Sequence, residues 1–485
     1  MSCESSEVSL ATTALARAFV AILATAWSSV SIGAADDRLV QAVRRGDIAA
    51  VGVLAKDRTL VNAPQADGAT PLHWAAHRDD LAVTDLLLKS GASPDAANDL
   101  GVTPLSLACT NGSAAIVARL LEAGANPNAN GSRVPPLMTC AQTGNVNAVK
   151  ALLAHNADAN AKEPLRGQTA LMWAAAQKHP EVVSALLARG ADVRARSSFT
   201  RVIVNRADPN SIDHAVVGPV SRGGSTALLF AARSGDVDSA TRLLRAGANV
   251  DDLMADGTSA LTVAAHSGHL DLVQLLLAEG ANPNIISSGY TALHAAVLRG
   301  NLEMAKTLVA RGANIDARLR HGTPTLRGSR DYVLPDSLTG ATPLWLAAKY
   351  LEVDIVRWLL DRGADPAAAL RDGTTMLMAA AGVGSQTKLF DRRDRVALLR
   401  DSDETRALAV SAILLARGTD VNAINEAADT ALHGAAAMSY PVVANALIER
   451  GARTEARNKK GETPFEVATG DAVRNLLREL AARPR

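Results

Sequence analysis

Histidine is the residue type whose placement in this 485-residue chain most invites a search for chemistry. An imidazole can act as a general base, a proton shuttle or a metal ligand near neutral pH. His73, His294 and His433 each stand fourth in a short recurring phrase that begins with threonine. Because they recur along a repeating scaffold rather than converge on one pocket, we interpret them as structural residues rather than catalytic ones.

A second group, His266 and His269 with Asp271, has the residue types of a metal site. However, Ser267-Gly268-His269 fits a turn between two helices, so we predict no metal there. The chain shows no glycine-rich phosphate loop, no nucleophile elbow and no zinc-type spacing of Cys and His. We therefore predict that it is not an enzyme and that it binds no cofactor and no metal.

The elements that carry these residues form a repeat. A phrase of the type Thr-Pro-Leu-His starts ten times, and a weaker copy begins at Pro135; most copies stand 32 to 34 residues apart. Each unit is too small to bury its own apolar face, so neighbouring units must stack. The clear copies begin at Thr70, Thr103, Thr169, Thr226, Ser259, Thr291, Thr342, Thr375, Thr430 and Thr463.

One unit, residues 67–98, shows how the repeat should fold. Thr70 is placed to cap the first helix, and Pro71 stands at its first position, where a missing N–H costs nothing. Gly91 is placed to end the second helix in the left-handed conformation. The units at the two chain ends are more polar and look like caps, which gives about 12 units.

A period near 33 with a T-P-L-H-x-A phrase is the ankyrin pattern, and the chain from about Asp36 to Arg485 resembles that family. The resemblance implies an all-α repeat solenoid of helix-turn-helix pairs with β-hairpin fingers. It implies that the repeated histidines satisfy backbone groups of the turn. It also implies protein binding through finger tips such as Arg371 and the exposed ends of the inner helices. Carried over, the candidate protein-binding residues are His77, Arg78, Asn111, Gln142, Gln177, Lys178, Arg233, His266, Tyr290, Arg299, Lys349 and Tyr350.

Cysteine is used sparingly. Cys3 lies near the N-terminus, whereas Cys109 and Cys140 fall on the inner helices of adjacent repeats. Adjacent packed helices lie about 8–10 Å apart, and a disulfide needs Cα atoms within roughly 7 Å. We therefore predict that Cys109 and Cys140 are small buried apolar residues that form no disulfide.

Three steps of the repeat are too long, and their surplus residues predict insertions at 197–222, 319–339 and 384–404. The first two would extend fingers, and we expect both long fingers to contact a partner, although each could instead fold back on its own repeat. The third is densely charged and falls between the two helices of one repeat. Insertions of this kind map to loops, often on the binding face.

Residues 1–35 do not fit the repeat and predict a cleaved signal peptide. Arg17 precedes an apolar run from Phe19 to Trp27, and small residues follow up to Ala35. The alternative is an uncleaved N-terminal anchor. Cleavage after Ala35 would release the solenoid into the periplasm or outside the cell.

The net charge of +1 supplies no global field for nucleic acid or a membrane surface. We predict a monomeric scaffold of bacterial exported type that binds another protein, one with an acidic or polar surface, and that has no membrane span after signal removal. Two alternatives stay open. One is a secreted effector that engages a host protein, and the other is an accessory or protective binder of an enzyme system.

Overall fold

The computed structural model describes residues 36–129, 131, 134–205, 217–322, 334, 336–384 and 403–481. These residues form two compact units. We call the first the N-terminal unit, residues 36–200 with 222–255, and the second the C-terminal unit, residues 201–205, 217–221 and 256–481. The predicted signal peptide and the centre of each predicted insertion lie outside the described residues.

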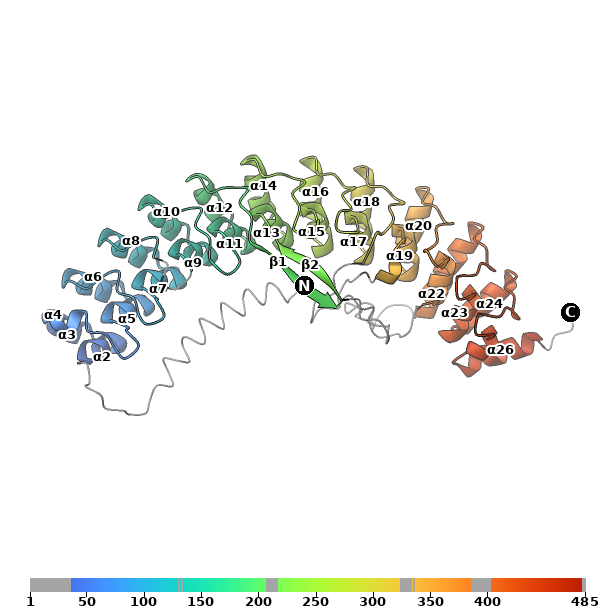
Figure 1. The fold of residues 1–485 in the computed structure, drawn as a ribbon, viewed down its shortest axis with the longest axis horizontal. Coiled ribbons are helices and arrows are strands. Elements are labelled where there is room, and N and C mark those ends of the chain that lie inside the picture. Colours follow the sequence, from blue (N-terminus) through green and yellow to red (C-terminus); the bar gives the residue numbers. More distant parts are fainter. Residues whose placement is uncertain are drawn as a thin grey trace. The chain divides into compact units, whose positions relative to one another are not determined.

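The N-terminal unit is a stack of helix pairs, in which inner helices pack on inner helices and outer helices on outer helices (Figure 1). It begins with α2 (Arg38–Arg45), α3 (Ile48–Leu54) and α4 (Arg58–Val61). The inner helices are α5 (Pro71–His77), α7 (Pro104–Asn111), α9 (Pro136–Thr143), α11 (Ala170–Ala176) and α13 (Ala227–Ser234). The outer helices are α6 (Leu81–Lys89), α8 (Ala114–Glu122), α10 (Val146–Ala154), α12 (Pro180–Leu187) and α14 (Val237–Arg245).

The C-terminal unit repeats the same arrangement. Its inner helices are α15 (Ala260–Ser267), α17 (Ala292–Leu298), α19 (Pro343–Lys349), α21 (Met376–Ala381), α23 (Ala431–Ala437) and α25 (Pro464–Val467). Its outer helices are α16 (Leu270–Ala278), α18 (Leu302–Ala310), α20 (Val353–Asp361), α22 (Asp403–Ala416), α24 (Pro441–Glu449) and α26 (Asp471–Ala481). The predicted fold class, an all-α repeat solenoid, is confirmed.

Helix boundaries follow the local sequence signals. The Thr103 hydroxyl accepts the backbone N–H of Ser106 at 3.2 Å and so caps α7. Asp80 caps the outer helix α6 by accepting the N–H of Val83 at 3.0 Å. Gly112 ends α7 with φ of 69°, in the left-handed region that favours glycine.

The core of each unit is a thin layer of leucine and alanine. In α17 all seven residues are buried, and in α5 only His77 reaches the surface. Small alanines on the inner helices let neighbouring helices approach closely, which explains why a stack with 3% aromatic residues still packs.

The described strands lie in the first predicted insertion. β1 (Phe199–Asn205) and β2 (Val217–Gly223) pair in a two-stranded sheet. The second predicted insertion contains the 3-10 helix η1 (Asp336–Leu338). After this helix, the Gly340 N–H donates to the Leu319 carbonyl, and the Leu319 N–H donates to the Ala341 carbonyl. Among the described residues, no helix combines the length and apolar character needed to cross a bilayer.

Candidate protein-binding surface

Side chains at the ends of several inner helices tie their repeat to the one before it. The Arg78 guanidinium donates to the Arg44 carbonyl at 2.8 Å, and Arg299 donates to the His266 carbonyl at 2.8 Å. Asn111 donates to the carbonyls of Ala76 and His77 at 2.9 and 2.8 Å. The last carbonyls of a helix have no partner within it, and these side chains from the next repeat supply one.

The other predicted residues at the helix ends lie at or near the surface. Lys178 is exposed, and its φ of 63° turns the chain between α11 and α12. Gln142 is half-buried, and its carbonyl pairs with His179 at 3.0 Å. Arg233 is half-buried over the Phe230 ring, with 6.0 Å between its guanidinium carbon and the ring centre. His77, Gln177, His266, Arg299 and Lys349 are also half-buried.

Tyr290 and Tyr350 correct the prediction, because the structure places both in the interior. Tyr290 is 7% exposed and lies edge-on to His266, with 6.1 Å between ring centres. Tyr350 is 3% exposed, and its carbonyl accepts a hydrogen bond from Arg406 at 3.4 Å. A tyrosine at a turn folds its large apolar ring inward against the stack, so neither ring is available to a partner.

Burial also changes the acid–base properties of this pair. Burial, together with the smaller effect of the nearby Arg299 charge, lowers the pKa of His266 to about 4. Burial raises the pKa of Tyr290, and the carboxylate of Asp256 adds to that shift. Both rings are therefore neutral over the physiological range.

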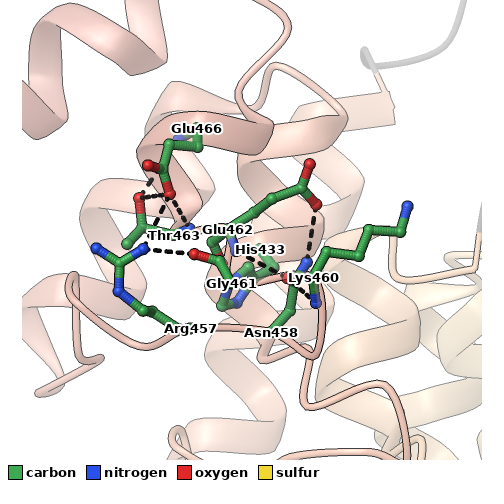
Figure 2. Close-up of polar contacts among 8 residues, drawn as sticks. All are labelled: His433, Arg457, Asn458, Lys460, Gly461, Glu462, Thr463 and Glu466. Atoms are coloured by element: carbon green, nitrogen blue, oxygen red, sulfur yellow. Dashed lines mark hydrogen bonds and ion pairs between the residues drawn. The ribbon is translucent and has the colours of Figure 1, made fainter.

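The repeated histidines are structural, as predicted. His433 lies on α23; its Nδ1 accepts the backbone N–H of Thr430 at 3.2 Å, and its Nε2 pairs with the Glu462 carbonyl of the last finger at 3.1 Å. Figure 2 shows this ring beside the finger that holds Asn458 and Thr463. With Nδ1 accepting from a backbone N–H, Nε2 is the nitrogen that donates to the next repeat.

His73 and His294 repeat this arrangement. Their Nε2 atoms pair with the carbonyls of Val102 at 2.9 Å and Ala341 at 3.3 Å. Burial lowers the pKa of His73 and lowers that of His294 to about 4. The three rings therefore join consecutive repeats and are not poised for catalysis.

An asparagine ladder, which the sequence did not lead us to expect, links successive loops. Asn160 donates to the Gly190 carbonyl at 3.0 Å and accepts the N–H of Asp192 at 2.7 Å. Asn284 does the same with Gly312 and Asn314, at 2.9 and 2.7 Å. The signal is the second polar residue of the phrase Gly-Ala-Asn/Asp-x-Asn, a residue type that the sequence suggests only as a turn former.

Cys109 and Cys140 form a disulfide, which overturns the prediction that they would not. Their Cα atoms are 4.6 Å apart, and both residues are fully buried between α7 and α9. The error lay in treating the separation of helix axes as the separation of Cα atoms. Each Cα stands about 2.3 Å from its own axis, so facing residues on close helices come several ångströms nearer than the axes do.

The described part of the chain holds no group of three or more His, Cys, Asp or Glu residues that could bind a metal ion. His269 instead stands at the N-cap of α16, and Asp271 lies in its first turn.

Stacked helix pairs joined by their loops define a protein of the repeat class, whose surface is built from many units. Comparison with known families agrees. Residues 39–131, 130–197, 199–287 and 228–318 match the family described as ankyrin repeats in three copies, and residues 339–369 match a single ankyrin repeat. These matches cover more than half of the chain, which therefore belongs to the ankyrin-repeat family.

Curated relatives match through the repeats alone. The chain is 34% identical over 142 residues to neurogenic locus notch homolog protein 1 of Xenopus tropicalis, which is 27% of this chain and 6% of that protein. It is 35% identical over 132 residues to mitochondrial disaggregase of Bos taurus, which is 24% of this chain and 19% of that protein. The chain thus corresponds to a small part of each relative.

Proposed function

We propose that this protein is a scaffold that binds another protein through the ends of its inner helices and its fingers, in a compartment outside the cytoplasm. Ankyrin repeats are protein-interaction modules, which supports binding in general. The proposed surface consists of His77, Arg78, Asn111, Gln142, Gln177, Lys178, Arg233, His266, Arg299 and Lys349.

The proposed binding surface carries hydrogen-bond donors, of which the Arg78 side chain is an example. The Arg78 guanidinium has five N–H donors, and its bond to the Arg44 carbonyl uses one of them. Arg78 and Lys178 are exposed, so their charges face solvent. A partner with an acidic or polar surface complements them.

The Cys109–Cys140 disulfide is the main observation in support of a location outside the cytoplasm. Disulfides persist in oxidising compartments and are rare in the cytosol. The signal-peptide pattern of residues 1–35 favours the same location independently. Together they support export to the periplasm or the cell exterior.

Two measurements on protein from its native host test the proposal. N-terminal sequencing should find a chain that starts near Asp36, and a full-length cytosolic product would remove the export claim. The mature chain, immobilised, should retain a protein from the extracytoplasmic fraction. That protein also separates the alternatives, since a host protein would favour an effector and an enzyme would favour an accessory binder.

A further inference from the structure

A cleft of about 870 Å³ opens along three successive fingers of the C-terminal unit. Three arginines line it, Arg318 and Arg320 on one finger and Arg371 on the next, and no acidic residue is among its lining residues. Ile286, Leu319 and Leu370 supply apolar wall. The cleft therefore combines a concentration of positive charge with surface on which an apolar stem can rest.

A backbone hydrogen bond that joins several other pairs of fingers is missing at this cleft. Several other fingers donate a backbone N–H to the finger before them: Asp99 to Asp67 at 3.0 Å, Arg320 to Gly289 at 2.8 Å, and Lys459 to Ala427 at 2.8 Å. Within the described residues, Arg371 makes no such bond to Gly340. Its N–H is left to pair with the backbone of an added chain.

The N-terminal unit contains the same arrangement in a closed form. Arg196 donates to the carbonyls of Gly224 at 2.7 Å and Leu253 at 2.8 Å, and its guanidinium also forms an ion pair with Asp252. The Asp252 side chain is only 8% exposed, so this carboxylate neutralises the arginine from within the fold.

Arg318 stands at the equivalent place but lacks that carboxylate. It donates to the equivalent carbonyls, of Gly340 at 3.4 Å and Ala369 at 3.3 Å. The residue that corresponds to Asp252 is Ala368, which is 4% exposed. Two carbonyls therefore hold Arg318 in position, while Ala368 supplies no carboxylate of the kind that Asp252 gives to Arg196.

Arg320 and Arg371 strengthen this imbalance. Both are exposed, and neither side chain has a hydrogen bond or ion pair within the described residues. Three guanidinium groups in one cleft raise the local concentration of anions, and guanidinium matches the planar carboxylate in geometry.

We propose that this cleft binds an acidic segment of the partner protein. An aspartate or glutamate side chain of that segment pairs with Arg318, as Asp252 pairs with Arg196. The inference rests on the proposed function, since it assumes a protein partner. A protein segment suits the cleft better than a free anion, because the cleft offers apolar wall and the unpaired N–H of Arg371 as well as charge.

The test uses mature chain and a fluorescent hexaglutamate peptide, with hexaglutamine and a six-residue oligothymidylate as probes of the same length. Binding is followed by fluorescence anisotropy at low and moderate salt. The cleft variant is Arg318→Gln/Arg320→Gln/Arg371→Gln, and Ala368→Asp restores the internal carboxylate. The outer-face control, Arg245→Gln/Arg357→Gln/Arg450→Gln, removes the same charge from exposed positions elsewhere.

The cleft variant should bind hexaglutamate at least tenfold more weakly, and Ala368→Asp several-fold more weakly, while the outer-face control changes affinity less than twofold. Equal losses of affinity in the cleft and control variants would show that only the net charge of the protein matters, and would overturn the proposal. Oligothymidylate binding that is as tight and equally cleft-dependent would assign the site to phosphate polymers instead. Because the three arginines are exposed, their variant tests the site even if Ala368→Asp does not fold.

Capture of the native partner separates the two proposals. If no extracytoplasmic protein is retained by the wild-type chain, the scaffold function fails. If a partner is retained equally by the wild-type chain and the cleft variant, the scaffold function stands and the cleft assignment fails.

Discussion

Single side chains hold neighbouring repeats together in this solenoid. Histidines at the helix starts, asparagines in the loops and arginines at the helix ends each satisfy a backbone group of an adjacent repeat. Such groups are costly to leave unpaired when they are buried. Residues that resemble catalytic or binding groups in the sequence thus have structural roles in the fold.

The neutral ring of His294 should make stability depend on pH. Its pKa is about 4 in the fold and about 6.5 in an unfolded chain. Between these values the unfolded state binds more protons, so stability is full above pH 6.5 and is lost as the pH falls toward 4. Ser106 occupies the equivalent place in its own repeat, so serine is a suitable replacement for His294. When the pH falls from 7 to 4.5, the free energy of unfolding of His294→Ser should fall by about 2 kcal/mol less than that of the wild type.

Urea denaturation at the two pH values measures this effect. The exposed His155→Ser serves as the control and should keep the wild-type difference. An unchanged difference in His294→Ser would show that this ring does not titrate as described.

A second prediction at the scale of the residue concerns the loss of the disulfide. Closing a loop of this size stabilises a fold by about 4 kcal/mol. The variant Cys109→Ala/Cys140→Ala places alanine where the first repeat has alanine, so packing is kept and the loss should come from the missing bond. Without reductant, alkylation of the unfolded wild-type chain should leave both residues unmodified, and two alkylated cysteines would contradict the bond.

At the scale of elements, asparagine side chains link several pairs of successive loops. Asn160→Ala removes two hydrogen bonds that join one loop to the next, so it should lower the free energy of unfolding by about 1–2 kcal/mol. The control is Asn445→Ala, whose side chain bonds only to Glu449 on its own helix and should cost less than about 0.5 kcal/mol. Equal effects of the two changes would mean that the ladder adds nothing to the stack.

The sequence predicts helices far better than it predicts which residues meet. Helix starts at threonine and ends at glycine follow local chemistry, so the phrase at Thr70 and Gly91 predicts a helix pair directly. The pairing of Cys109 with Cys140 and the burial of Tyr290 depend on how closely two helices approach. That separation is set by packing of small residues from several repeats, and no local pattern encodes it.

The missing carboxylate at Ala368 is another feature of this kind. It becomes visible only when two structurally equivalent fingers are compared, because the surplus residues of both insertions hide the correspondence in the sequence.

At the scale of the whole molecule, positive side chains at equivalent helix ends should speed association with a partner. Charges at the rim of an interface act mainly on the association rate and its salt dependence. Replacing Arg233, Arg299 and Lys349 together by Ser should slow association and flatten its dependence on salt. Because Arg299 also bonds to His266, a melting curve must show that the variant is folded, and unchanged kinetics in a folded variant would remove the claim.

The most direct test of the scaffold function is capture from the extracytoplasmic fraction with three immobilised forms of the mature chain. The forms are wild type, a surface variant with Arg78→Ser, Lys178→Ser and Arg233→Ser, and the outer-face control. We predict that one protein is retained by wild type and by the control and is lost from the surface variant. Retention that is equal on all three forms, or no retained protein at all, would contradict a binding surface at the ends of the inner helices.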